Sequence, residues 1–165
     1  MQKYLSEWQK KIFEIEKQLT SIDKDLAKTR SELNKWCINE ILGHLIDSAI
    51  NNHRRFILMQ IQDNLIFEGY EQDKWVELQN YIIKDLRTLI ETWEILNLNI
   101  ISSLMEVNPS IWRKEYEVHS FDEILWKEIP KTIPATPEYF VKDYFGHLVH
   151  HLKQIFEIGG IKFSM

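Results

Sequence analysis

Residues 136–160 read TPEYFVKDYFGHLVHHLKQIFEIGG, and this stretch decides the fold class. It opens with an N-cap residue, Thr136, then a proline at the first helical position and an acid in the first turn. It ends with two glycines, which commonly terminate helices. Between these signals, apolar residues recur at helical spacing and predict one long amphipathic helix. They are Phe140, Tyr144, Leu148, Leu152, Ile155 and Phe156.

Three other stretches carry the same periodicity. We expect helices from residue 3 to the low twenties, over about 37–62 and over about 77–106. Residues 64–74 are expected to connect the second helix to the third, with Gly69 as the turn residue. Residues 108–135 contain all but one of the four prolines and predict an irregular connection. Four such helices fit an all-α four-helix bundle built around one core.

Composition bounds the class of protein. The 165 residues correspond to one domain, residues 1–165, and 44% hydrophobic residues exclude a disordered chain. The net charge of −5 argues against nucleic-acid binding, and the single cysteine excludes a disulfide framework. No apolar run reaches the roughly 18 residues of a membrane span, and the charged start does not resemble a signal peptide. A cytoplasmic location with no membrane partner is therefore expected.

Three of the six histidines lie close together in the last predicted helix. His147 and His151 are four residues apart, so they share a helix face and could grip one divalent metal. Both lie at the edge of the apolar arc, whereas His150 lies further round, facing outward or supporting its neighbours. His44 lies at the edge of the apolar arc of the second helix. The alternative is that these are core histidines without a metal.

A short unit is repeated in the second and fourth helices. Residues 40–45 (EILGHL) align with residues 143–148 (DYFGHL) as acid, two apolar residues, glycine, histidine and leucine. Glu40 and Asp143 each precede a histidine by four residues, so each could accept the free imidazole N–H and orient the ring. They could equally be solvated acids. Gly43 and Gly146 suggest close helix approach or room for a ligand.

A polar strip accompanies His44 along the second helix. It comprises His44, Asp47, Ser48, Asn51 and Arg55. It is either a solvated face or the lining of a metal pocket. In the second case Asp47 is a candidate general base, and Arg55 could bind a substrate carboxylate in a bidentate manner.

Two motifs resemble the DinB/YfiT-like metalloenzyme superfamily. Residues 36–48 (WCINEILGHLIDS) match the family pattern W-[ST]-x-x-E-x-x-x-H-L-x-D, and residues 147–151 (HLVHH) match H-x-x-H-H. Cys37 departs from the pattern, because serine or threonine normally caps this helix. It is either a reactive thiol at a helix N-terminus or a small buried residue.

The resemblance implies an up-down-down-up bundle with a divalent metal held by His44, His147 and His151. Zinc, nickel and iron all suit imidazole ligands. Family members with known activity are thiol-dependent S-transferases, isomerases or hydrolases acting on small molecules, and homodimers are common. The resemblance therefore implies a metal-dependent hydrolase or an S-transferase that uses a low-molecular-weight thiol. The alternative is a non-catalytic small-molecule-binding or stress-response protein with a structural metal or none.

Overall fold

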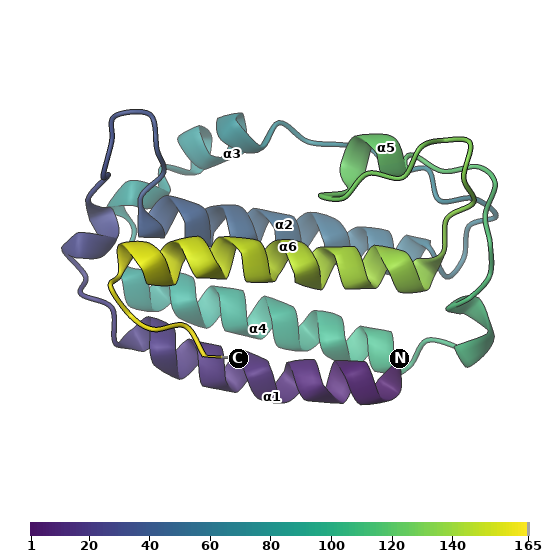
Figure 1. Cartoon of the computed structure of the whole chain (residues 1–165), viewed down its shortest axis with the longest axis horizontal. Helices are drawn as coiled ribbons and strands as arrows, with labels where there is room; N and C mark the ends of the chain where they lie inside the picture. Colours follow the sequence, from purple (N-terminus) through teal and green to yellow (C-terminus); the bar gives the residue numbers. More distant parts are fainter. Residues whose placement is uncertain (165) are drawn as a thin grey trace.

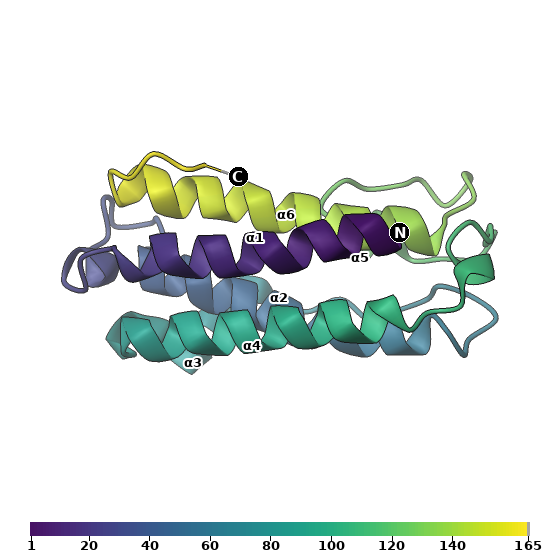
Figure 2. The same cartoon turned by 90° about the horizontal axis from the view of Figure 1, so that it is seen from below.

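The computed structural model describes residues 1–164 as an all-helical protein without a β-sheet. The four long helices are α1 (Gln2–Thr20), α2 (Ile38–Leu58), α4 (Leu86–Met105) and α6 (Pro137–Ile158). They form the four-helix bundle expected from the periodicity (Figure 1; Figure 2). Shorter elements complete the chain: α3 (Gln72–Gln79), α5 (Phe121–Ile124) and 3-10 turns at Leu26–Lys28, Tyr81–Ile83 and Pro109–Ile111.

The direction of the four helices explains the long connections. The chain runs one way along α1 and α6 and the opposite way along α2 and α4, as Figure 1 shows. Because α2 and α4 are parallel, residues 59–85 must return along the bundle to join them, and α3 lies on this return. This return connection, residues 59–85, therefore covers one face of α2.

Apolar stripes hold the bundle together. In α1 the buried side chains are Leu5, Trp8, Ile12, Ile15 and Leu19. Each fully buried side chain of this size contributes roughly 1.5–3 kcal/mol, so the single face of α1 fixes it to the bundle. The ring of Trp8 stacks on Phe145 of α6 with centroids 4.4 Å apart. No helix in residues 1–164 combines the length and the apolar character needed to cross a bilayer.

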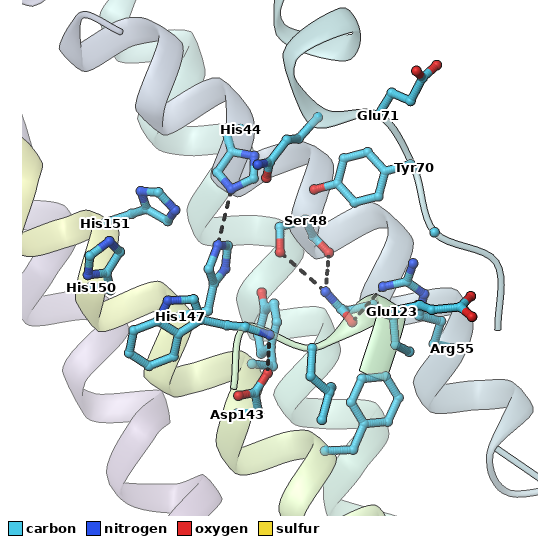
Figure 3. A pocket seen from close by; sticks show the side chains of 18 of the residues that line it. His44, Ser48, Arg55, Tyr70, Glu71, Glu123, Asp143, His147, His150 and His151 are labelled. Carbon is cyan, nitrogen blue, oxygen red and sulfur yellow. Dashed lines mark hydrogen bonds between the residues drawn. The ribbon is translucent and has the colours of Figure 1, made fainter. Parts of the chain in front are cut away.

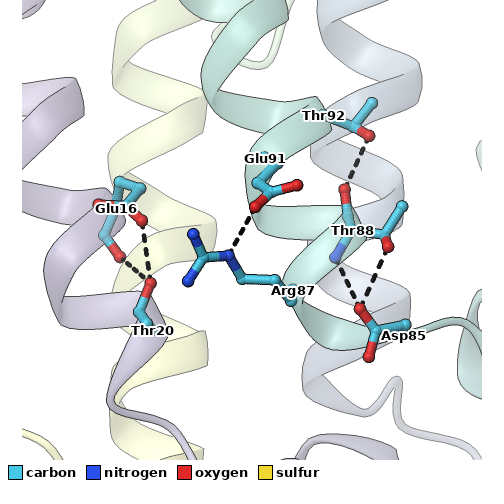
Figure 4. A network of polar contacts seen from close by, with 7 residues as sticks. All are labelled: Glu16, Thr20, Asp85, Arg87, Thr88, Glu91 and Thr92. Carbon is cyan, nitrogen blue, oxygen red and sulfur yellow. Dashed lines mark hydrogen bonds and ion pairs between the residues drawn. The ribbon is translucent and has the colours of Figure 1, made fainter.

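The prediction of one continuous helix over residues 77–106 is wrong in its first part. Asn80 adopts a left-handed conformation (φ 50°, ψ 51°) that ends α3, and Leu78 is 83% exposed rather than in the core. A new helix then starts where the Asp85 carboxylate accepts the backbone N–H of Thr88 at 2.9 Å (Figure 4). These local interactions override the continuous apolar period.

Residues 108–135, which the sequence leaves irregular, are fastened to the return connection. Leu65 pairs with His119 in an isolated parallel bridge, and Tyr116 pairs with Ala135 in an antiparallel one. The Ser120 hydroxyl accepts the N–H of Phe67 at 2.9 Å and donates to its carbonyl at 3.0 Å. These contacts hold the short helix α5 beside the connection, above α2 and α6 (Figure 1).

Candidate metal centre and cavity

Three histidines from α2 and α6 meet inside the bundle. His44 Nε2 lies 3.2 Å from His147 Nε2, and the His151 ring lies 4.8 Å from the His44 ring, centroid to centroid. One ring nitrogen from each of the three residues lies within 4.8 Å of the others. His44 is buried, whereas His147 and His151 are half-buried and face the same space (Figure 3).

The helix ends set the register that brings these rings together. The Thr136 hydroxyl accepts the N–H of Tyr139 at 3.2 Å and starts α6, and Gly160, with φ +64°, follows its end. His147 and His151 are one turn apart on this helix, so both rings project from the same face. The shared face expected for His147 and His151 is therefore observed, with their ring centroids 4.5 Å apart.

The electrostatic environment keeps these rings neutral. Burial, with a smaller contribution from neighbouring imidazoles, lowers the pKa of His44 to about 3 and that of His147 to about 2. Burial also lowers the pKa of His151. A neutral imidazole offers a lone pair, which is the form that binds a metal.

The geometry of the cluster fits a divalent metal ion. Two nitrogen ligands about 2.0–2.1 Å from a tetrahedral ion lie about 3.3 Å apart, close to the 3.2 Å between the Nε2 atoms of His44 and His147. Three imidazoles leave room for a further ligand, as in catalytic sites. The donor set suits several first-row metals, including zinc, nickel and iron.

Gln154 supports His151, a role that the motif analysis missed. Its side-chain oxygen lies 2.8 Å from His151 Nδ1, so that nitrogen donates the hydrogen bond and Nε2 carries the lone pair. Such partners fix the orientation of a ligating ring. The i, i+3 spacing of the two residues is the only signal in the sequence.

The two acids expected to orient the histidines have other partners. Glu40 forms an ion pair with Arg30 and accepts the backbone N–H of Cys37 at 2.9 Å, so it caps α2. His44 Nδ1 has no hydrogen-bond partner within residues 1–164, so Glu40 does not orient that ring. This corrects the interpretation of Glu40, because the helix N-terminus and Arg30 compete for its carboxylate.

Asp143 holds a loop instead of His147. Its two carboxylate oxygens accept the backbone N–H groups of Trp126 and Lys127 at 3.0 and 2.9 Å. The Trp126 ring thereby packs on His150, with centroids 5.3 Å apart, and His150 is exposed as expected. Asp143 therefore positions one wall of the site rather than a ligand.

The polar strip of α2 divides between two faces. His44, Ser48, Asn52 and Arg55 line one cavity, and Asn52 is a lining residue that the sequence analysis did not select. Asp47 is 0% exposed and accepts the Tyr81 hydroxyl at 2.7 Å, outside that lining. The general-base interpretation of Asp47 is replaced by a structural one, since a bound molecule cannot reach it.

Aromatic rings pack closely against the two glycines that precede His44 and His147. A Cβ on Gly43 would lie 2.1 Å from the Tyr81 ring, and a Cβ on Gly146 would lie 3.3 Å from Trp126. Each glycine thus lets a connection approach its helix, a role different from the helix approach or ligand space expected for them. Cys37 is fully buried, and burial raises the pKa of its thiol to about 11, which favours the inert interpretation.

The cavity beside the histidines has a volume of about 720 Å³. Its floor is formed by α2 and α6, and its walls by the return connection and the α5 segment (Figure 3). Besides the four residues of α2, the lining contains Gly69, Tyr70, Glu71, Gln72, Asp73, Lys74, Glu123, Ile124, Leu125, Trp126, Phe140, Asp143, Tyr144, His147, His150 and His151. This volume suits a small organic molecule.

Comparisons with known proteins agree with the motif resemblance. The chain is 28% identical over 88 residues to a protein of Halalkalibacterium halodurans, covering 50% of this chain and 51% of the relative. It is 22% identical over 155 residues to a protein of Oceanobacillus iheyensis, covering 92% and 83%. Both relatives are named "Putative metal-dependent hydrolase". The chain thus matches about half the length of the first relative and most of the second. No protein-family model matches the chain.

A solved structure shares the fold. YfiT from Bacillus subtilis, "a probable metal-dependent hydrolase with an unusual four-helix bundle topology", superposes with a TM-score of 0.76 at 18% identity. The match covers 98% of this chain and 89% of YfiT. The fold and the sequence relatives together support the resemblance to the DinB/YfiT-like metalloenzyme superfamily.

Proposed function

We propose that this protein, a relative of the DinB/YfiT-like metalloenzymes, is a metal-dependent hydrolase of a small molecule. One observation carries the proposal: three neutral imidazoles from two helices converge at the wall of a cavity of about 720 Å³. A purely structural site would be closed by a fourth protein ligand, whereas this group faces open space.

His44, His147 and His151 would hold the metal, with Gln154 orienting His151. When bound, a divalent ion supplies Lewis-acid activation of a carbonyl group or of water. Burial keeps the three rings unprotonated, so they remain ready to bind the ion across the neutral pH range. Trp126, held over α6 by Asp143, shields one side of the cavity from water.

The test is the metal content of tag-free protein, measured by elemental analysis. We expect about one divalent ion per chain in the wild type and none in the His44→Ala/His147→Ala/His151→Ala variant. His53→Ala is the matched control, because His53 lies on the same helix as His44 and outside the cavity lining. Metal retained at one per chain by the triple variant would refute the assignment.

Turnover is tested with a panel of small esters and amides, with and without a low-molecular-weight thiol such as cysteine. Hydrolysis that is lost on chelation and restored by zinc, nickel or ferrous iron supports the proposal. Turnover that requires the thiol would replace hydrolysis with S-transfer. A fully metallated protein that turns over nothing, yet binds ligands in the cavity, would favour the non-catalytic alternative.

A further inference from the structure

Arg55 is a buried cation at the far end of the same cavity. Its side chain is only 5% exposed, yet it forms no ion pair with any acidic side chain in the described part of the chain. Its Nη2 donates to the Glu68 carbonyl at 2.6 Å, and its Nη1 donates to the Asn52 side-chain oxygen at 3.3 Å. Both acceptors are neutral, so the positive charge is not neutralised.

Burying a guanidinium without an anionic partner is energetically unfavourable, unless a bound anion compensates its charge. Removing a guanidinium from water without an anionic partner disfavours its charged form, and burial accordingly lowers the pKa of Arg55. A guanidinium has five N–H donors, of which two are used here, so the remaining donors can form a fork toward a planar anion. The group lines the cavity beside Tyr70, whose ring faces the same space (Figure 3).

We propose that Arg55 binds a carboxylate of the substrate and so restricts the reaction to small carboxylic acids. That the bound molecule is a substrate rests on the proposed hydrolase function. Arg55 lies 11 residues after His44 on α2, so their Cα atoms are about 16 Å apart along the helix. The carboxylate therefore lies several bonds away from the group at the histidines, and the bound molecule is elongated.

The charge of the lining favours a monoanion over a phosphate. Four acids, Glu71, Asp73, Glu123 and Asp143, and two bases, Arg55 and Lys74, line the cavity. Lys74 already pairs with Glu71 at 2.7 Å. With a divalent cation at the histidines, the charged lining residues and the ion together have no formal net charge. Each negative charge on the ligand is then repelled by the acidic side chains of the lining. A singly charged carboxylate is thus tolerated better than a dianion.

The test uses 4-phenylbutyrate, its neutral amide and 3-phenylpropylphosphonate as probes at pH 9, where the phosphonate is a dianion, with binding measured by calorimetry on the full chain. We expect the carboxylate to bind at least tenfold more tightly than the amide and more tightly than the phosphonate. Equal affinity for the acid and the amide would overturn the proposal, and tighter phosphonate binding would overturn the choice of a carboxylate. Neither comparison depends on a variant that must fold.

Variants locate the binding. Arg55→Met should weaken carboxylate binding at least tenfold, and Arg55→Lys, which keeps the charge but loses the fork, about fivefold. Arg54→Met is the control, because Arg54 is the exposed neighbour outside this lining, and it should bind within twofold of wild type. Unchanged binding in both Arg55 variants would refute the assignment.

The triple histidine variant separates this inference from the proposed function. Carboxylate binding that persists in the triple variant, together with a metallated wild-type protein that turns over nothing, leaves the Arg55 subsite standing while the hydrolase proposal fails. Binding that disappears with the histidines, although Arg55 is intact, places the carboxylate at the metal site. That result overturns the Arg55 inference and leaves the hydrolase proposal untouched.

Discussion

Alanine substitution should destabilise the protein at Gly43 but not at Gly146. Both glycines are inside long helices, where replacing glycine by alanine gains about 1 kcal/mol in helix propensity. The difference lies in the ring that each glycine admits. At Gly146 the new methyl group would lie 3.3 Å from Trp126, a 42% exposed ring that can shift slightly. We expect Gly146→Ala to be neutral or to stabilise by up to about 1 kcal/mol.

At Gly43 the new methyl group would lie 2.1 Å from the Tyr81 ring, where ordinary carbon contacts are about 3.5–4.0 Å. Tyr81 is only 5% exposed, and its hydroxyl donates to the buried Asp47. Displacing the ring costs about 1–3 kcal/mol in strain, and leaving a buried carboxylate without its donor costs about 1–3 kcal/mol. These losses exceed the gain in propensity, so Gly43→Ala should destabilise by about 1–5 kcal/mol.

The assay is urea denaturation followed by far-ultraviolet circular dichroism. A double variant isolates the cause: in a Tyr81→Ala background the clash is gone, so Gly43→Ala should stabilise by about 1 kcal/mol. If Gly43→Ala were as stable as Gly146→Ala in the wild-type background, the close approach of Tyr81 to α2 would not be part of the folded state. A cost that persisted in the Tyr81→Ala background would also refute the reasoning.

Three further outcomes follow from the site. Burial opposes ionisation of Glu40, but Arg30 and the Cys37 N–H hold its pKa below the usual value. The ionised carboxylate therefore stabilises the fold above pH ~4.3, and this stabilisation is lost as the pH falls through the folded-state pKa. Glu40→Gln should lower stability at neutral pH and flatten the acid limb of the stability curve, whereas an unchanged acid limb would contradict this. Because its thiol is buried with a raised pKa, native Cys37 should resist iodoacetamide at pH 8 and react only after unfolding; rapid modification of folded protein would refute the assignment. Asp143→Ala should speed amide exchange at Trp126 by at least tenfold while metal content stays unchanged, and loss of metal would restore a direct role for Asp143 in orienting His147.

Helix register is the part of the site that the sequence predicts well. The helix faces on which the three histidines lie follow from where α2 and α6 begin and from the 3.6-residue period, both of which are local properties. That His44 meets the two histidines of α6 was implied only by the family resemblance. The same reasoning predicts less reliably which residues of the polar strip face the cavity. Asp47 is three residues after His44, about 60° round the helix, and that rotation is enough to turn it toward Tyr81 instead of the cavity.

Helical periodicity does not predict contacts between a helix residue and a distant loop. Asp143 binds N–H groups 16 and 17 residues earlier, and Glu40 pairs with Arg30, which lies in an irregular segment. Nothing in a helical pattern specifies how those loops fold. The break at Asn80 did carry a signal, because Asp85 and Thr88 have cap spacing, but the apolar period continued across it.

The parallel course of α2 and α4 has a consequence for how such a protein can diversify. It requires a long return connection, and that connection supplies residues 69–74 of the cavity wall while the three histidines remain on the bundle helices. Loops tolerate substitution and insertion far better than packed helices do. Changes in the connection can therefore reshape one wall of the cavity without disturbing helix packing, while the three histidines and Arg55 keep their places on the bundle helices.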